Sequence, residues 1–210
     1  IVGAGLSGIE LASELRESRS DLEILLYDRG PRILRNFPEK LSKYISNWFS
    51  KHNVTVVPNS VIDRVEPGKI YNNGKPENID LVVWTAGIQP VEIVRNLPID
   101  MSTTGRVIIN QYHQVPTYRN VYVVGDCANL PHAPSAQLAE LQGEQIAEVL
   151  KKQWSNEPLP DKMPEIKVQG FLGSLGDKQG FAYIMDRTVT GRLASILKSG
   201  VLWRYKYHNG

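Results

Sequence analysis

The chain has 210 residues, which is enough for one large domain or two small ones. Apolar residues make up 41% and charged residues 22% of it, an ordinary globular composition, and no apolar run approaches the roughly 18–20 residues of a membrane span. The net charge of +2 gives no electrostatic support for nucleic-acid binding. A single cysteine, Cys127, excludes an internal disulfide and any C-x-x-C redox or zinc motif. We therefore expect no metal site, and a reducing compartment fits.

The first half of the sequence alternates between strand and helix patterns. Ile1 already belongs to an apolar strand, so we expect the chain to be a fragment with residues upstream. Helices are predicted after Gly8 and after Phe37-Pro38, the second with Leu41, Tyr44, Ile45, Trp48 and Phe49 on one face. Strands are predicted at 1–2, 22–27, 54–57, 60–66, 69–71 and 79–84, with a turn at 72–74. This order predicts an α/β fold with a doubly wound parallel sheet and a small antiparallel layer.

The second half predicts fewer elements. We expect strands at 106–110 and 120–124, a helix at 136–151, a proline-marked linker from 158 to 164, short glycine-rich strand pieces at 168–183 and a helix at 191–207. We divide the chain into a nucleotide-binding domain (1–95), the returning part of a second dinucleotide-type domain (96–157) and a small C-terminal α+β region (158–210).

A glycine-rich turn joins the first strand to the first helix. Gly3 allows the tight turn, Gly5 lets backbone N–H groups approach a pyrophosphate, and Gly8 lets helix and strand pack closely. Leu6 and Ser7 open the helix, whose N-terminus favours phosphate. The sequence predicts a dinucleotide site here. The alternative is a glycine-rich turn with no ligand, as occurs in any α/β protein.

An acidic residue ends the next strand. Asp28 stands 20 residues after Gly8, the spacing expected of an acid that binds an adenosine ribose. Its carboxylate would repel a 2′-phosphate, so NADH is favoured over NADPH, and Arg29 beside it weakens that preference. In the alternative reading Asp28 is a solvated strand end.

Two later segments resemble motifs of flavoproteins with two dinucleotide-binding folds. The strand that ends in Gly125-Asp126 resembles their second flavin motif, in which the aspartate binds ribityl hydroxyls; a buried carboxylate needs such partners. Thr85-Ala86-Gly87-Ile88-Gln89-Pro90 resembles their connector, where Gly87 leaves room for a cofactor and Pro90 fixes the chain direction. Taken singly, each segment is also compatible with an ordinary turn.

Together the three motifs cover roughly the first 150 residues and resemble the pyridine-nucleotide–disulfide reductase superfamily. The resemblance implies that residues 3–95 bind NADH and that the chain from about Asn96 completes an FAD domain. The first flavin fingerprint is implied to lie upstream, so this fragment alone should bind FAD poorly and be inactive. Cys127 alone does not supply the cysteine pair of a disulfide reductase, and we interpret it as a small buried residue.

Within that superfamily the chain is most similar to type II NADH dehydrogenases. Trp84-Thr85-Ala86-Gly87 resembles their connector, and Ser135 to Gln142 resembles their quinone-side motif, with Leu141 standing where the motif has glutamine. The resemblance places Ala86, Gly87, Ala136 and Gln137 near the cofactors or a quinone carbonyl. It also places Glu10 near nicotinamide and flavin. The alternatives are a polar first helical turn for Gln137 and Gln142 and, for Glu10, a carboxylate favoured in a first helical turn.

The C-terminal segment resembles the same family in Gly191-Arg192-Leu193-Ala194. On the expected helix the apolar residues lie near basic ones; they are Leu193, Ile196, Leu197, Val201 and Leu202, near Lys198, Arg204, Lys206 and His208. This pattern is compatible with an interfacial helix on a membrane surface. A packed terminal helix or a homodimer surface is the alternative.

The resemblance implies a flavin-dependent NADH oxidoreductase that passes electrons from NADH through FAD to an acceptor, a quinone in the first instance. Glu10 and Gln137 are the catalytic candidates. It also implies a cytoplasmic location, free or peripheral at the inner face of the membrane. One alternative is a soluble reductase with another acceptor, such as ferredoxin. The other is a nucleotide-binding regulatory protein without catalysis.

Overall fold

The computed structural model describes residues 1–168 and 170–209, without the side chains of residues 202, 204–206, 208 and 209. Two compact units make up the chain, and each is described by itself. The first joins Ile1–Gly87 to Gln169–Gly210, and the second is Ile88–Val168. Residues 158–210, expected as one region, are thus divided between the two units. The overall mixed α/β class is confirmed.

The first unit contains a short parallel sheet. Strands β1 (Ile24–Tyr27) and β2 (Val54–Val57) pair in parallel, and Val2 forms parallel bridges with both Tyr27 and Trp84. The spatial order is therefore Trp84, Val2, β1, β2. This is the order of a dinucleotide-binding half, in which the first strand lies between the second and the fourth. The predicted strand at 79–84 is present only as the bridge at Trp84.

Two helices cover one face of this sheet. Helix α1 (Leu6–Ser18) and helix α2 (Glu39–Lys51) bury apolar side chains at helical spacing. The α2 face expected from the sequence is confirmed, because Leu41, Ile45, Trp48 and Phe49 are all buried. These side chains share one core with Ile9 of α1 and with strand β1.

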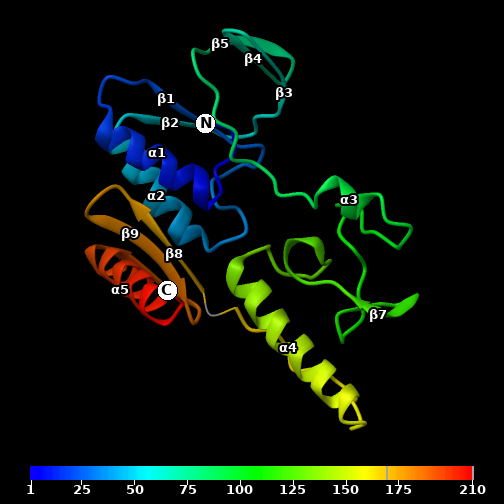
Figure 1. The fold of residues 1–210 in the computed structure, drawn as a ribbon. Coiled ribbons are helices and arrows are strands. Elements are labelled where there is room, and N and C mark those ends of the chain that lie inside the picture. Colours follow the sequence, from blue (N-terminus) through cyan, green and yellow to red (C-terminus); the bar gives the residue numbers. More distant parts are fainter. Residues whose placement is uncertain (169, 210) are drawn as a thin grey trace. The chain divides into compact units, whose positions relative to one another are not determined.

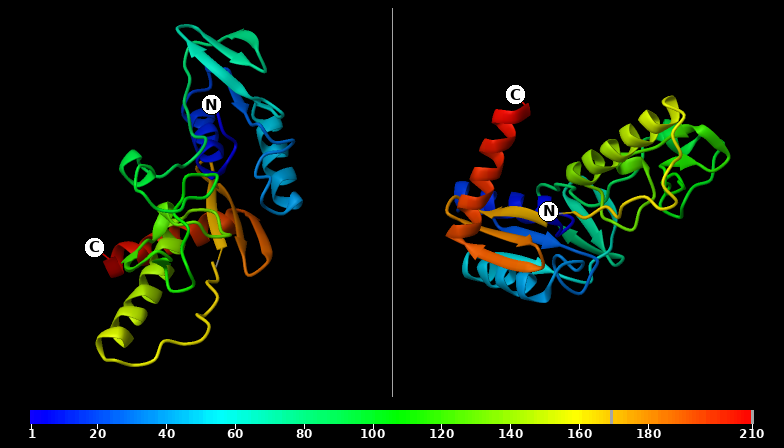
Figure 2. Two further views of the ribbon diagram at one scale, coloured as in Figure 1. Left: turned by 90° about the vertical axis from the view of Figure 1, so that its right-hand side faces the viewer. Right: turned by 90° about the horizontal axis from the view of Figure 1, so that it is seen from below.

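An antiparallel sheet lies against the other side of α1 and α2. Strands β8 (Gly170–Leu175), β9 (Gln179–Ile184) and β10 (Arg187–Gly191) pair in sequence order, and Leu175 and Phe181 enter the core of the two helices. Helix α5 (Arg192–Asn209) packs on the far face of this sheet. Figures 1 and 2 show the resulting stack of sheet, helices, sheet and helix. The C-terminal segment is thus an integral layer of the first unit.

A small meander completes the first unit. Strands β3 (Ile62–Glu66), β4 (Lys69–Asn72) and β5 (Lys75–Asn78) are antiparallel, and the expected turn contains Asn73 and Gly74 at positive φ. Buried Tyr27 donates its hydroxyl to Glu77 of β5, 2.5 Å away. Burial and the Glu77 carboxylate both raise the Tyr27 pKa.

The second unit has one long helix and short strands. Helix α4 (Ala136–Trp154) begins with Ser135, whose hydroxyl accepts the Leu138 N–H at 3.2 Å. The other elements are α3 (Glu92–Arg95), β6 (Gln114–Val115), β7 (Tyr118–Tyr122) and the 3₁₀ turn η1 (Gly125–Cys127).

Two strand predictions in this unit are wrong in detail. Residues 106–110 form no strand, because Val107 makes only isolated bridges, with Met101 and Ala128. Strand β7 ends at Tyr122 and is largely exposed, although an apolar strand through residue 124 was expected. Apolar composition predicted burial here, but no second layer of the described chain covers this strand.

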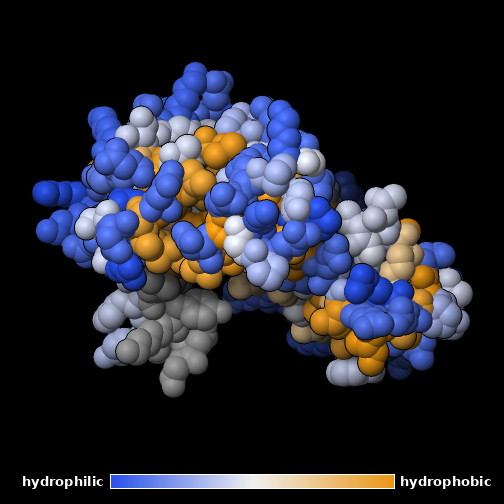
Figure 3. All heavy atoms as spheres, turned by 90° about the horizontal axis from the view of Figure 1, so that it is seen from above, coloured by the Kyte–Doolittle hydropathy of each residue, from blue (hydrophilic) through white to orange (hydrophobic). Residues whose placement is uncertain are grey.

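Several large apolar side chains are exposed on the surface. Those in the connector and the second unit include Ile88, Val91, Ile93, Leu97, Tyr118, Val121 and Val124. Figure 3 shows apolar patches bordered by hydrophilic residues on one face of the molecule. Among the described residues, no helix has the length and hydropathy needed to cross a bilayer.

Candidate cofactor site

The glycine-rich turn is packed against the connector that follows Trp84. Gly3 has φ +106°, and a β-carbon there would lie 2.8 Å from the β-carbon of Ala86. A β-carbon at Gly8 would lie 1.9 Å from the Gly3 carbonyl oxygen and 2.8 Å from the Thr85 hydroxyl. That hydroxyl donates to the carbonyls of Gly3 and Val2. Helix, turn and connector therefore meet where only glycine fits, as the sequence predicts.

The middle glycine differs from its neighbours. A β-carbon at Gly5 would have nothing within 4 Å, and Gly5 is exposed. It caps α1 without any side-chain hydrogen bond. The positive end of the α1 dipole therefore faces free space at Gly5. The next two residues are half-buried Leu6 and exposed Ser7. Such an open helix N-terminus is able to bind a pyrophosphate.

Asp28 uses both carboxylate oxygens on backbone groups. Oδ2 accepts the Ala4 N–H at 2.8 Å, and Oδ1 accepts the Gly30 N–H at 2.7 Å. The side chain therefore ties the glycine-rich turn to the loop after β1. Each oxygen retains a second lone pair for a ribose hydroxyl. Arg29 beside it is exposed.

Glu10 is held by the C-terminal segment. It is the fifth residue of α1, so the expected place in the first turn is wrong; that turn contains no acid. Its Oε1 accepts the Ser174 N–H of β8 at 2.7 Å and forms an ion pair with Lys198 of α5. Lys198 also donates to the Ser174 hydroxyl at 2.6 Å. One carboxylate thus joins three elements of the first unit.

The connector residues Ala86 and Gly87 stand at the end of this unit. Ala86 is half-buried against Gly3, and its carbonyl accepts the Trp84 indole N–H at 2.8 Å. Gly87 is exposed at φ +81°, with nothing within 4 Å of a β-carbon there. The space expected beside Gly87 is present.

In the second unit, Asp126 is exposed, not buried as expected. Within the part of the chain that the structure describes, its carboxylate has no hydrogen bond or ion pair. Its backbone is well held, since the Asp126 carbonyl accepts from Arg106 at 3.1 Å and the Cys127 carbonyl accepts the Val107 N–H at 2.8 Å. Cys127 itself is half-buried, so the expectation of a buried cysteine is met only in part.

The helix that follows carries the expected quinone-side residues. Ala136 is exposed, Gln137 and Leu141 are half-buried, and Gln142 is fully buried. Gln137 is the second residue of α4 and lies in its first turn, whereas Gln142 is the seventh, so the reading as a polar first-turn residue is wrong for Gln142. Its Oε1 accepts the Gly125 N–H at 2.9 Å, which directs it to the turn and away from the helix surface.

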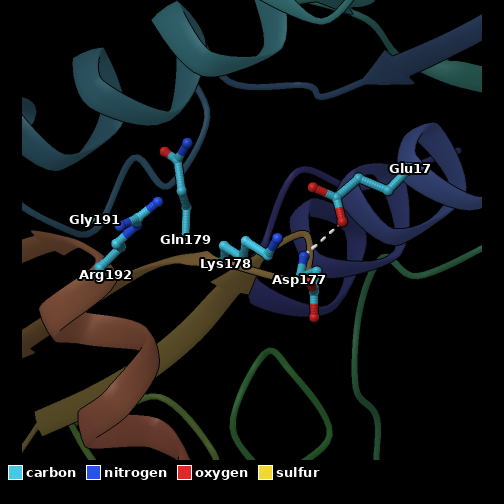
Figure 4. Close-up of a pocket in the computed structure, with 6 residues that line it drawn as sticks. All are labelled: Glu17, Asp177, Lys178, Gln179, Gly191 and Arg192. Carbon is cyan, nitrogen blue, oxygen red and sulfur yellow. Dashed lines mark hydrogen bonds between the residues drawn. The ribbon is translucent and has the colours of Figure 1, made fainter.

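A polar hollow of about 630 Å³ lies elsewhere in the first unit. Figure 4 shows Glu17 of α1 on one side and Arg192 with Gln179 on the other, with Lys178 between them. Glu17 accepts the Asp177 N–H at 2.5 Å, which fastens α1 to the β8–β9 turn. None of the residues expected to bind a cofactor lines this hollow, so it does not belong to the candidate site.

Sequence reasoning missed the residues that hold the site from a distance. Thr85 begins the connector motif, but its hydroxyl contact with the glycine-rich turn was not predicted from the sequence. Ser174 and Lys198 are 164 and 188 residues from Glu10, so no local pattern connects them with it. Arg106 was not expected to take part, although its two carbonyl partners, Ile88 and Asp126, lie in segments that the sequence pointed to.

Comparison with known proteins agrees with this geometry. Residues 1–143 match the family model described as pyridine nucleotide-disulphide oxidoreductase. The NADH dehydrogenase-like protein YutJ of Bacillus subtilis is 55% identical over all 210 residues, which make up 59% of that protein. The type II NADH:quinone oxidoreductase of Haemophilus influenzae is 26% identical, over 86% of this chain and 47% of its own. The chain therefore spans about half to three fifths of these relatives.

Solved structures show the same fold. NDH2 from Plasmodium falciparum in complex with NADH aligns with a TM-score of 0.79 at 15% identity, covering 96% of this chain and 60% of that one. The sulfide:quinone oxidoreductase from Aquifex aeolicus aligns with a TM-score of 0.77 at 18% identity, covering 95% of this chain and 53% of that one. The resemblance to type II NADH dehydrogenases is confirmed.

Proposed function

Because the chain belongs to the pyridine nucleotide-disulphide oxidoreductase family, we propose that it is part of an enzyme that oxidises NADH through FAD. The relatives with matching sequence are NADH dehydrogenase-like and type II NADH:quinone oxidoreductases. The chain covers only part of their length, so activity is assigned to the full-length protein and not to this segment.

The observation that carries the proposal is the open cradle at Gly5. Gly3 and Gly8 are closely packed, whereas Gly5 faces free space at the uncapped N-terminus of α1. This geometry fits a dinucleotide pyrophosphate bound by backbone N–H groups. Each Asp28 carboxylate oxygen already accepts one backbone N–H and keeps a second lone pair. These lone pairs accept hydrogen bonds from the hydroxyls of the adenosine ribose. A 2′-phosphate at that place would face a carboxylate, which favours NADH over NADPH.

The Gly125–Asp126 turn fits a flavin polyol. The Asp126 carboxylate is exposed and has no partner in the described chain, whereas the Asp126 carbonyl and the Gly125 N–H before it are both hydrogen-bonded. Ribityl hydroxyls would supply the donors that this carboxylate lacks. FAD, when bound, would supply the redox chemistry that takes electrons from a hydride donor and passes them to the acceptor. We also assign Ala86, Gly87, Gly125 and Ala136 to cofactor binding; Gly87 and Ala136 are exposed, and Ala86 and Gly125 are half-buried.

Glu10 and Lys198 form the charged part of the proposed site. We assign Glu10 to the nicotinamide side, where Lys198 and the Ser174 N–H fix its carboxylate. Since Glu10 comes from α1 and Lys198 from α5, this residue is positioned by the C-terminal layer. Gln137, at the second position of α4, is assigned to the acceptor side.

We propose a quinone as the acceptor. Leu141, half-buried where the related motif has glutamine, favours a second candidate, a reductase with a non-quinone acceptor such as ferredoxin. For the partner surface, α5 presents exposed Leu193, Ile196, Val201 and Trp203, which suit a membrane surface or a second copy of the chain. Leu202, Arg204, Lys206 and His208, which belonged to the same prediction, have side chains outside the described residues.

Steady-state kinetics of the full-length protein tests the proposal. We expect bound FAD, visible by its absorption, and NADH turnover with a short-chain quinone analogue. Turnover with ferredoxin or a dye but not with the quinone analogue would favour the second candidate. Protein that binds no flavin and oxidises no NADH would refute both and leave a nucleotide-binding protein without catalysis.

A further inference from the structure

One arginine connects two segments that the proposed function places at the flavin. Arg106 Nη2 donates to the Ile88 carbonyl at 3.0 Å, and Nε donates to the Asp126 carbonyl at 3.1 Å. Nη1 donates to the Thr104 hydroxyl at 3.1 Å. Ile88 belongs to the connector and Asp126 to the turn, and both lie in the second unit. A planar guanidinium is suited to such a contact, because its donors diverge at fixed angles.

The backbone beside Arg106 is also paired with the turn. Val107 is fully buried; its N–H donates to the Cys127 carbonyl at 2.8 Å, and its carbonyl accepts the Asn129 N–H at 2.9 Å. Arg106 itself accepts the Ser102 N–H at 2.7 Å. The arginine therefore starts from a fixed backbone, so only its side-chain torsions have to be ordered when it binds the two carbonyls.

Gln142 holds the other end of the same turn. Its buried Oε1 accepts the Gly125 N–H at 2.9 Å, and one turn earlier on α4 the Ala139 methyl lies 3.6 Å from where a Gly125 β-carbon would stand. Gly125 has φ +69°, a conformation that L side chains rarely adopt. The chain that follows β7 is thus pinned against α4, which Figure 1 shows as the long helix of this part of the molecule.

The two attachments bracket one peptide. Gln142 binds the N–H of Gly125, and Arg106 binds the carbonyl of Asp126. The Asp126 carboxylate stays exposed. The direction of a short side chain follows from its backbone angles. Loss of either hydrogen bond would let the backbone angles of Gly125 and Asp126 change, although the Asp126 carboxylate would still be present.

We propose that Arg106 and Gln142 are positioning residues for FAD: they set the Asp126 carboxylate for the ribityl chain, and Arg106 couples this turn to the connector at Ile88. The inference rests on the proposed function, because it requires that Asp126 bind the flavin. Neither residue needs to touch the cofactor, so their effect must appear as a change in flavin binding with an intact Asp126.

The test compares Arg106→Met and Arg106→Lys with the parent full-length protein. Lysine can restore one carbonyl contact but not both, and methionine restores none. We expect the FAD dissociation constant to rise about tenfold for Arg106→Met, about what the loss of one or two hydrogen bonds produces, and less for Arg106→Lys. NAD⁺ affinity, measured by titration, should stay at the parent value, and the absorption spectrum of the bound flavin should shift.

Arg119→Met is the matched control. Arg119 lies in the same unit and is exposed, and within the described chain its side chain has no hydrogen bond or ion pair. We expect parent FAD affinity from it. Gln142→Leu should resemble Arg106→Met, and the double variant should lose more than either single one.

The outcomes separate the two proposals. Parent FAD affinity and an unchanged flavin spectrum in Arg106→Met, in a parent that binds FAD, would overturn the positioning role and leave the proposed function intact. Equal losses of FAD and NAD⁺ affinity together with a lower melting temperature would indicate only a structural role, and would also overturn it. A parent that binds no FAD would overturn both. If Arg106→Met does not fold, Arg106→Lys decides by the same measurements.

Discussion

Asp28 directly follows strand β1, whereas Asp126 lies in the turn η1 after strand β7, and the two carboxylates have different hydrogen-bond partners. Asp28, in the first unit, accepts the N–H groups of Ala4 and Gly30, so both of its oxygens are already engaged by the protein. Asp126, in the second unit, is exposed, and its carboxylate has no partner in the described chain. In its case the protein holds only the backbone, through Gln142 and Arg106.

The two aspartates illustrate two ways in which a protein can hold a carboxylate that binds a polyhydroxyl ligand. At Asp28 the ligand would share a carboxylate that also closes the loop, so binding and folding use the same group. At Asp126 the ligand would supply all the donors, so the carboxylate contributes little to stability before binding. Mutations at the first site should therefore affect stability and affinity together, and mutations at the second should affect affinity alone.

The largest expected effect comes from Gly8→Ala. The added methyl would meet the Gly3 carbonyl oxygen at 1.9 Å, and backbone cannot move away as a flexible side chain can. We expect a loss of about 3 kcal/mol or more in the free energy of unfolding, measured by urea denaturation. Gly5→Ala is the control, because free space surrounds that position; it should keep parent stability and weaken NADH binding. Equal stability of the two variants would show that the turn is not closely packed.

Asp28→Asn and Asp126→Asn test the comparison directly. The asparagine amide at position 28 would turn a donor toward one of two backbone N–H groups, which leaves that group unsatisfied. We expect Asp28→Asn to lose about 2 kcal/mol of unfolding free energy in the absence of ligand. Asp126→Asn should melt at the parent temperature but bind FAD more weakly. Equal destabilisation by both substitutions would break the distinction between the two acids.

Glu10→Gln and Lys198→Met examine how the C-terminal layer supports the first unit. Removing one charge of a half-buried ion pair should cost about 1 kcal/mol, because Glu10 also binds the Ser174 N–H and Lys198 the Ser174 hydroxyl. We expect a lower kcat with NADH for both variants and a smaller stability loss for Glu10→Gln, whose oxygen still accepts from Ser174. Lys43→Met, which removes an exposed helical pair on α2, should change neither quantity.

The smallest expected effect is on coenzyme choice. Arg29 is exposed beside Asp28 and is the available cation for a 2′-phosphate. Arg29→Ala should raise the ratio of kcat/KM for NADH over NADPH by about threefold, a change of under 1 kcal/mol, without altering stability. Asp28→Ala or Asp28→Arg should lower that ratio. A ratio that none of the three substitutions changes would remove both residues from coenzyme recognition.

The sequence predicts the first unit better than the second because its signals are local. The glycine spacing, the apolar face of α2 and the Asn73–Gly74 turn each depend on neighbouring residues, and the structure contains all three. The sequence spacing between Gly8 and Asp28 is also a local signal, because it equals the length of one helix and one strand, and the structure contains both.

The remaining features depend on contacts between distant segments. Nothing near Glu10 indicates that Lys198 will face it, and nothing near Asp126 indicates that it will be exposed. The apolar run at 120–124 predicts burial, but burial requires a covering layer, and composition does not say whether one is present. Likewise, the position of Gln142 in a motif does not reveal that its amide turns inward to Gly125.

The return of residues 170–191 to the first unit has a consequence for biosynthesis. Leu175 and Phe181 complete the core that contains Ile9 and Leu41, and more than eighty residues of the second unit separate these halves in the chain. During translation, the ribosome releases the glycine-rich turn long before the strands that close its core. The first unit must therefore remain with an exposed hydrophobic face until these strands emerge, which is the situation in which chaperones and folding order matter most.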